Sequence, residues 1–146
     1  MKDNSDVKGL LSETVHQWPI RIYYEDTDMQ GIVYYANYLK YLERARTEYF
    51  RFAGFEQGEL IEKQGIAFAV RAIKVDYLKP AKFNDELLVI TKVAEVKGAS
   101  LIFHQTIVRA HSKHEIINKA VIKVACLDAQ SMKVKAIPTL MIEQLT

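Results

Sequence analysis

The segment from Tyr24 to Tyr35 has the residue types and spacing of a site for acyl transfer. It carries two aspartates, Asp26 and Asp28, followed by Gly31 and a run of apolar and aromatic residues. The segment joins a predicted strand to a predicted long helix, where backbone N–H groups are unpaired and the helix dipole is positive. A carboxylate beside free N–H donors suits acyl transfer, because one group attacks or activates water and the other holds the oxyanion.

Hydrophobic periodicity predicts the elements that position this segment. Trp18 to Tyr24 is β-branched and aromatic and predicts a strand. From about Tyr34, apolar residues recur at three- and four-residue spacing, which predicts an amphipathic helix of roughly five turns that ends at Gly54. Its apolar stripes are wide, so we expect the helix to be largely enclosed. A short second helix is predicted at residues 57–64.

The remainder of the chain alternates in the manner of β-strands. Short links between consecutive strands favour antiparallel pairing. The predicted fold class is therefore α+β, with a curved antiparallel sheet of about five strands wrapped around one long central helix. We expect residues 1–15 to form a flexible extension and residues 16–146 to form a single domain. Four strands are predicted after the helices, at about residues 67–78, 86–96, 100–109 and 116–127, and a tail begins at Ala136.

Composition argues against several function classes. The chain has 146 residues and a net charge of +2, so no strong attraction to nucleic acid or anionic membranes is implied. The sequence shows neither a membrane-spanning apolar stretch nor a signal peptide, which predicts a cytoplasmic protein. Cys126 is the single cysteine and lies in an apolar run, so it is predicted to be a small buried hydrophobe. Metal-ligand spacing is absent, and no cofactor is expected.

Asp28 is the strongest candidate for the chemical step. A carboxylate at this position could attack an acyl group directly to give an anhydride or could instead deprotonate a water, and the sequence leaves both routes open. Taken alone, such an aspartate more commonly caps a helix or a turn. Asp26 is predicted to orient the loop by hydrogen bonds, since two close carboxylates would raise one pKa. Glu43, beside Arg44 and Arg46, is predicted to be a paired, structural carboxylate.

Several stretches together resemble the signature of a known family. The likeness is to hotdog-fold acyl-CoA thioesterases of the 4-hydroxybenzoyl-CoA thioesterase type, and in particular to the bacterial Tol-Pal-cluster branch. It covers about residues 18–138 and implies a sheet wrapped around the helix, with subunits that join edge to edge, often as dimers of dimers. It also implies an acyl-CoA site at the subunit interface. The matching stretches are Tyr24–Asp28, Gly31–Tyr35, Asn37–Tyr38, Tyr41–Arg46, Phe68–Arg71 and Val75–Ala81.

The resemblance implies roles for particular residues. Asp28 corresponds to the catalytic carboxylate, and the backbone N–H of Tyr35 corresponds to the oxyanion donor. Gly31, Val33 and Asn37 are expected to contact the substrate, with Asn37 also a candidate helix cap. The pair Met29-Gln30 departs from the smaller or different residues of relatives, which concerns the shape of the acyl pocket.

The expected activity is hydrolysis of an acyl-CoA to a free acid and coenzyme A. Two alternatives stay open, a thioesterase for acyl carrier protein and a non-catalytic acyl-CoA-binding module. Arg71 is our first choice of cation for the coenzyme A phosphates, because it falls among strand residues that would neighbour the interface. Other candidate cations are Lys74, Lys79, Lys82, Lys97 and Arg109.

Overall fold

A computed structural model describes residues 15–145. The predicted extension lies outside the described residues, apart from Val15, which is the first residue of strand β1. The elements in chain order are β1 (Val15–Arg21), the 3₁₀ turn η1 (Tyr24–Asp26), α2 (Asn37–Phe52), α3 (Gln57–Glu59), the π-helical turn η2 (Leu60–Gln64), β2 (Ile66–Tyr77), β3 (Glu86–Lys97), β4 (Ser100–Arg109), β5 (Glu115–Asp128) and α4 (Thr139–Leu145).

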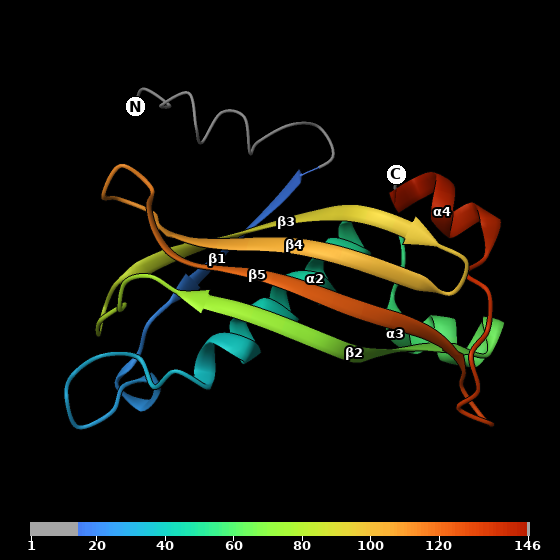
Figure 1. Ribbon diagram of the computed structural model, residues 1–146, viewed down its shortest axis with the longest axis horizontal. Coiled ribbons are helices and arrows are strands. Elements are labelled where there is room, and N and C mark those ends of the chain that lie inside the picture. Colours follow the sequence, from blue (N-terminus) through green and yellow to red (C-terminus); the bar gives the residue numbers. More distant parts are fainter. Residues whose placement is uncertain (1–14, 146) are drawn as a thin grey trace.

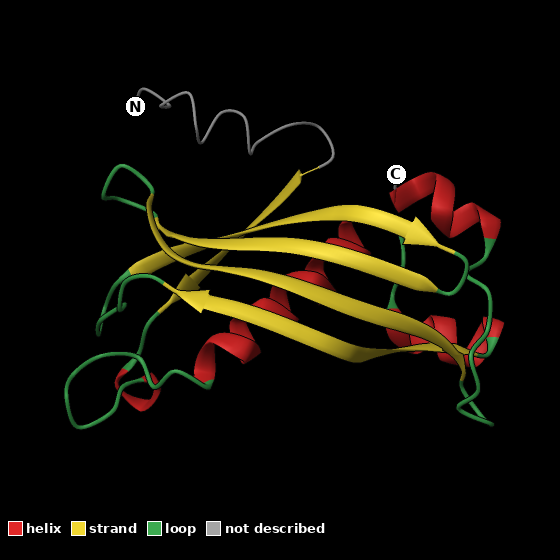
Figure 2. Ribbon diagram, viewed as in Figure 1, coloured by secondary structure: helices red, strands yellow, loops and turns green. Residues whose placement is uncertain are grey.

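The five strands form one antiparallel sheet in the order β1-β3-β4-β5-β2, which leaves β1 and β2 at its edges. Helix α2 crosses one face of this curved sheet (Figures 1 and 2). The predicted α+β class and the hotdog arrangement are confirmed. The tail predicted from Ala136 was incomplete, because α4 forms there and buries Met141 and Leu145.

Helix α2 is covered by the sheet on one side only. Tyr41 and Leu42 are almost fully buried against the strands, where Phe103 is also fully buried. The opposite side of the helix carries exposed polar residues, Lys40, Glu43, Arg44 and Arg51. Leu39 is 41% exposed, and Phe52, beside His16 of β1 at the end of the helix, is 75% exposed. The expectation of a largely enclosed helix was therefore wrong for the protomer, because the curved sheet covers only one side of the helix.

A buried polar network joins α2 to the middle of the sheet. The Gln105 amide nitrogen donates to the Leu42 carbonyl at 3.0 Å and to Thr91 Oγ1 at 2.9 Å, and its Oε1 accepts from Arg46 Nη1 at 3.0 Å. Arg46 is 8% exposed, and burial lowers the pKa of its guanidinium. The prediction that Glu43 pairs with an arginine was wrong among residues 15–145, where Glu43 forms no ion pair and its Oε2 accepts from Thr47 Oγ1 at 2.6 Å.

His16 in β1 gives the fold a testable pH dependence. Its ring packs beside Trp18, Tyr49 and Phe52 with centroid distances of 5.2–6.4 Å. Burial lowers the pKa of His16, and the nearby charge of Glu48 opposes this shift only in part. The folded state therefore holds the neutral ring, and the unfolded state takes up a proton near pH 6.5. We expect the resulting stability above about pH 6.5 to be lost as the pH falls through that value.

The substitution His16→Phe keeps an aromatic ring and removes the titrating group. Urea unfolding from pH 7.5 down to pH 5 should show a smaller loss of unfolding free energy for this variant than for the unmodified chain. Equal losses in the two proteins would show that His16 does not carry this pH dependence.

Candidate active site

The segment between β1 and α2 is held by short-range hydrogen bonds. Asp26 Oδ2 accepts from the Tyr23 N–H at 2.7 Å, and Thr27 Oγ1 donates to the Tyr24 carbonyl at 2.8 Å. The prediction that Asp26 orients the loop is thus confirmed. Asn37 does not cap the helix. It is the first residue of α2, and its Nδ2 donates to the Asp26 carbonyl at 2.9 Å, which ties the helix to the loop.

Asp28 opens a tight turn at the tip of this loop. Its carbonyl accepts from the Gly31 N–H at 3.0 Å, and its Oδ1 accepts from the Gln30 N–H at 2.8 Å. Gly31 has a φ of +80°, a left-handed conformation that glycine adopts without steric cost. The Asp28 side chain is exposed, and its Oδ2 accepts no hydrogen bond from residues 15–145. The turn therefore fixes one carboxylate oxygen and leaves the other free.

Tyr35 presents a backbone N–H that donates to no group in the described part of the chain. Of the nearby N–H groups, that of Tyr34 donates to the Asp26 carbonyl at 2.9 Å and that of Asn37 donates to the Tyr34 carbonyl at 2.8 Å. The Ala36 N–H, like that of Tyr35, has no acceptor among residues 15–145. The Tyr35 carbonyl accepts from Tyr77 Oη at 3.2 Å. Tyr35 is thus anchored through its carbonyl while its N–H stays available at the start of α2, as an oxyanion donor requires.

A groove of about 310 Å³ lies beside Tyr35. Val33 contributes only an edge to it, because this residue is 3% exposed and its N–H donates to the Ala81 carbonyl at 2.8 Å. Asp28 does not line the groove in the protomer. The lining residues come from the loop, from α2 and from the end of β2: Ile32, Val33, Tyr35, Tyr38, Tyr77, Leu78, Lys79 and Pro80.

Some of the candidate cations for coenzyme A are still available to bind phosphate, and one is engaged within the protein. Arg71 is exposed at a β-bulge between Val70 and Ala72, forms no ion pair with residues 15–145, and does not line the groove. Lys79 lines the groove and pairs with Glu115 at 3.1 Å. Arg109 is fully engaged inside the protein, with three acceptors for its guanidinium. The structure therefore removes Arg109 from the list of candidates.

Sequence reasoning missed two tyrosines at the site. Tyr77 holds the Tyr35 carbonyl, and Tyr38 Oη accepts from the Ala81 N–H at 3.0 Å. Burial raises the pKa of both phenols, which keeps them neutral as hydrogen-bonding groups. In the sequence Tyr38 is one member of the apolar helix stripe and Tyr77 is the aromatic end of a strand, and both lie in stretches that carry the family resemblance. Neither pattern indicates a contact with a segment some forty residues away.

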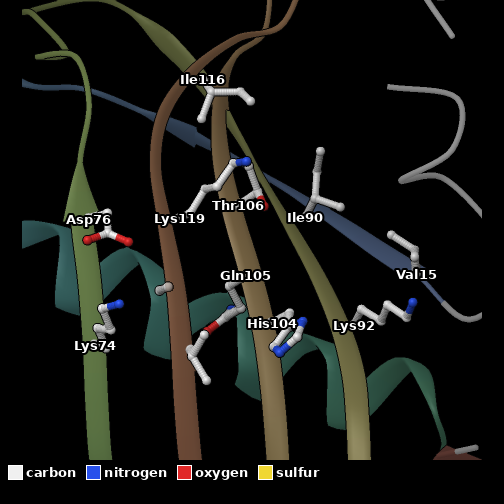
Figure 3. Close-up of a pocket in the computed structure, with 12 residues that line it drawn as sticks. Val15, Lys74, Asp76, Ile90, Lys92, His104, Gln105, Thr106, Ile116 and Lys119 are labelled. Atoms are coloured by element: carbon white, nitrogen blue, oxygen red, sulfur yellow. The ribbon is translucent and has the colours of Figure 1, made fainter. Parts of the chain in front are cut away.

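A larger hollow, of about 600 Å³, lies on the sheet face opposite α2 (Figure 3). Its lining includes three lysines, Lys74, Lys92 and Lys119, together with His104, and Asp76 is the one carboxylate. None of these three lysines forms an ion pair with residues 15–145. No helix of residues 15–145 begins at this hollow, so the described chain supplies no free helix N–H groups there, in contrast to the Tyr35 groove.

Two further findings concern residues 15–145. They contain no group of three or more His, Cys, Asp or Glu side chains placed to hold a metal ion. None of their helices is long and apolar enough to cross a membrane. Cys126 is buried and unpaired, as predicted.

The chain is similar in sequence to proteins named as thioesterases. The "Acyl-CoA thioesterase YbgC" of Haemophilus influenzae is 48% identical over 121 residues, which are 83% of this chain and 87% of that protein. The "Acyl-CoA thioester hydrolase YbgC" of Escherichia coli O6:H1 is 41% identical over 128 residues, 88% of this chain and 93% of that protein.

Solved structures show the same fold. A probable thioesterase from Bartonella henselae superposes with a TM-score of 0.79 at 28% identity, covering 85% of this chain and 99% of the other. A 4-hydroxybenzoyl-CoA thioesterase mutant in complex with 4-hydroxybenzoyl-CoA gives 0.84 at 21% identity, covering 91% and 99%. The family model described as "Thioesterase-like superfamily" matches residues 23–145. The chain belongs to the thioesterase-like superfamily.

Proposed function

We propose that this chain hydrolyses an acyl-CoA thioester to a free acid and coenzyme A, with Asp28 as nucleophile or general base and the Tyr35 N–H as oxyanion donor. One observation carries the assignment of residues: a carboxylate with a free oxygen and an unpaired N–H lie in one short loop at the start of α2. The relatives named acyl-CoA thioesterase or thioester hydrolase support the enzyme class.

Each group has a defined task in this proposal. If Asp28 attacks, its oxygen bonds to the thioester carbon, the carbonyl oxygen becomes an oxyanion, and the Tyr35 N–H stabilises that charge. The carbon–sulfur bond then breaks, the thiolate of coenzyme A leaves, and water hydrolyses the mixed anhydride to restore Asp28. If Asp28 acts as a base, it takes a proton from the water that attacks the same carbon.

We further propose that two protomers join along β2, and that such dimers pair again. Strand β2 has twelve residues and an unpaired edge. Long unpaired edges favour pairing with another chain. Along it Val70 and Ile73 are 49% and 41% exposed, and Tyr35 is 63% exposed nearby. A partner across this edge would close the groove that the protomer leaves open. Gly31, Val33 and Asn37 stay proposed substrate contacts, and Arg71, at the same edge, stays our proposed contact for the coenzyme A phosphates.

The substitution Ile73→Lys tests the proposed edge. A buried lysine without a partner opposes burial of this surface, so we expect smaller particles and a loss of thioesterase activity together. Light scattering after size-exclusion chromatography gives the mass, and it also separates a dimer from a tetramer. Ile61→Lys, at a residue 49% exposed in η2, is the matched control and should change neither property. An Ile73→Lys protein with unchanged mass would rule out this interface.

The function itself is tested by thiol release from a panel of substrates. The panel should include short, long and aromatic acyl-CoA thioesters and an acyl carrier protein loaded with the same acyl groups. We expect release from at least one acyl-CoA with a higher kcat/KM than from the matched carrier protein. Preference for the carrier would identify a carrier-protein thioesterase, and tight binding without release would identify a binding module. We place the enzyme in the cytoplasm, where a free thiol such as Cys126 stays reduced.

A further inference from the structure

Arg109, at the end of β4, holds three segments together. Its Nε donates to Glu115 Oε1 at 3.0 Å, its Nη2 donates to the Pro80 carbonyl at 3.0 Å, and its Nη1 donates to the Asp85 carboxylate. The side chain is only 17% exposed. Glu115 begins β5, whereas Pro80 and Asp85 belong to the link between β2 and β3. The guanidinium therefore fixes this link, residues 78–85, against the sheet.

The same link supports the loop that carries the proposed catalytic groups. The Ala81 carbonyl accepts from the Val33 N–H at 2.8 Å, and the Ala81 N–H donates to Tyr38 Oη at 3.0 Å. Ile32 forms a β-bridge with Lys82. Ala81 is fully buried, so this residue of the link has little freedom to shift without displacing its neighbours. Val33 lies two residues before Tyr35, and the Tyr35 N–H is therefore held at a position that the link determines.

We propose that Arg109 is a positioning residue for thioester hydrolysis, acting through residues 78–85 on the Tyr35 N–H and on Asp28. The proposal rests on the function proposed above. Arginine suits the task because its planar fork reaches three acceptors at once with charge-assisted hydrogen bonds. A lysine supplies one point charge and cannot hold the Pro80 carbonyl, Asp85 and Glu115 together. Without the guanidinium, the Asp85 and Glu115 carboxylates lose the cation that they share, and Lys79 stays paired with Glu115.

The first test is the substitution Arg109→Ala in the full chain. We expect kcat to fall by about tenfold to a hundredfold, as displacement of reacting groups by about 1 Å would produce, with KM little changed. Added methylguanidinium should restore part of kcat by occupying the vacated space, whereas Arg109→Lys should restore little. Arg51→Ala is the matched control, because Arg51 is an exposed arginine whose ion pairs, to Glu48 and Glu56, lie at the far end of α2. Its kcat should equal that of the unmodified chain.

A second measurement does not depend on activity. Hydrogen exchange of the Val33 amide reports whether its bond to Ala81 is maintained, and it should be faster in Arg109→Ala than in Arg51→Ala. If Arg109→Ala fails to fold, Asp85→Asn takes its place, since it removes one of the charged acceptors and keeps the arginine. A folded variant with unchanged kcat and unchanged Val33 exchange would overturn the inference. If the unmodified chain shows no thioesterase activity, the proposed function is overturned. Faster Val33 exchange in the variant would then still show that Arg109 holds residues 78–85 in place.

Discussion

Replacement of Asp28 by asparagine lowers kcat for acyl-CoA hydrolysis by about 10²–10⁴-fold, the range typical for loss of a positioned acid–base group. The amide can neither attack the thioester carbon nor take a proton from water. It can still accept the hydrogen bond from the Gln30 N–H, so the turn should keep its shape. Because the side chain is exposed, the free energy of unfolding should change by less than about 0.5 kcal/mol.

Steady-state thiol release measures this effect, and Glu25→Gln provides the control. Glu25 is an exposed acid three residues earlier in the same segment, and its substitution removes the same unit of charge. We expect its kcat and KM to match the unmodified chain. Equal rates for Asp28→Asn and the unmodified chain would exclude Asp28 from the chemical step. A similar loss in both variants would instead indicate a general effect of negative charge on the loop.

Replacement of Gln105 by leucine destabilises the fold by about 3–5 kcal/mol, as expected when a buried charge loses its partner. Gln105 is 1% exposed and satisfies three groups at once: the Arg46 guanidinium, the Leu42 carbonyl and the Thr91 hydroxyl. Leucine fills a similar volume and offers no hydrogen bond. All three groups are then left buried without this partner, and the desolvated guanidinium contributes the largest cost.

A double-mutant cycle separates the charge from the packing. Arg46→Met keeps a long apolar side chain and removes the cation, so its cost should be smaller than that of Gln105→Leu. In the double variant the uncompensated charge is absent, and the loss should be clearly less than the sum of the two single losses. Urea unfolding of the four proteins gives the comparison. Additive losses would mean that the guanidinium does not depend on Gln105.

The sequence alone determined most of the elements and the turn geometry of the candidate-site loop. Alternation of apolar residues located β2 to β5 to within a few residues, because side chains of a strand point to opposite faces. The three- and four-residue spacing located α2, because residues at that spacing lie on one side of a helix. The acids and glycine of the loop could also be assigned locally: Asp26 binds the N–H of Tyr23, and Gly31 adopts a positive φ.

Tertiary structure alone decided which distant residues meet. Arg46 was considered only as a neighbour that could pair with Glu43, yet its long side chain reaches Gln105, 59 residues further along the chain. The hydrogen bonds from Arg109 to Pro80 and Asp85 could not be predicted from the sequence either. Periodicity shows which side of an element is apolar, because that pattern is read from residues close together in the sequence. Which polar group faces it from another element depends on strand order and register, and these arise only when the whole sheet closes over the helix.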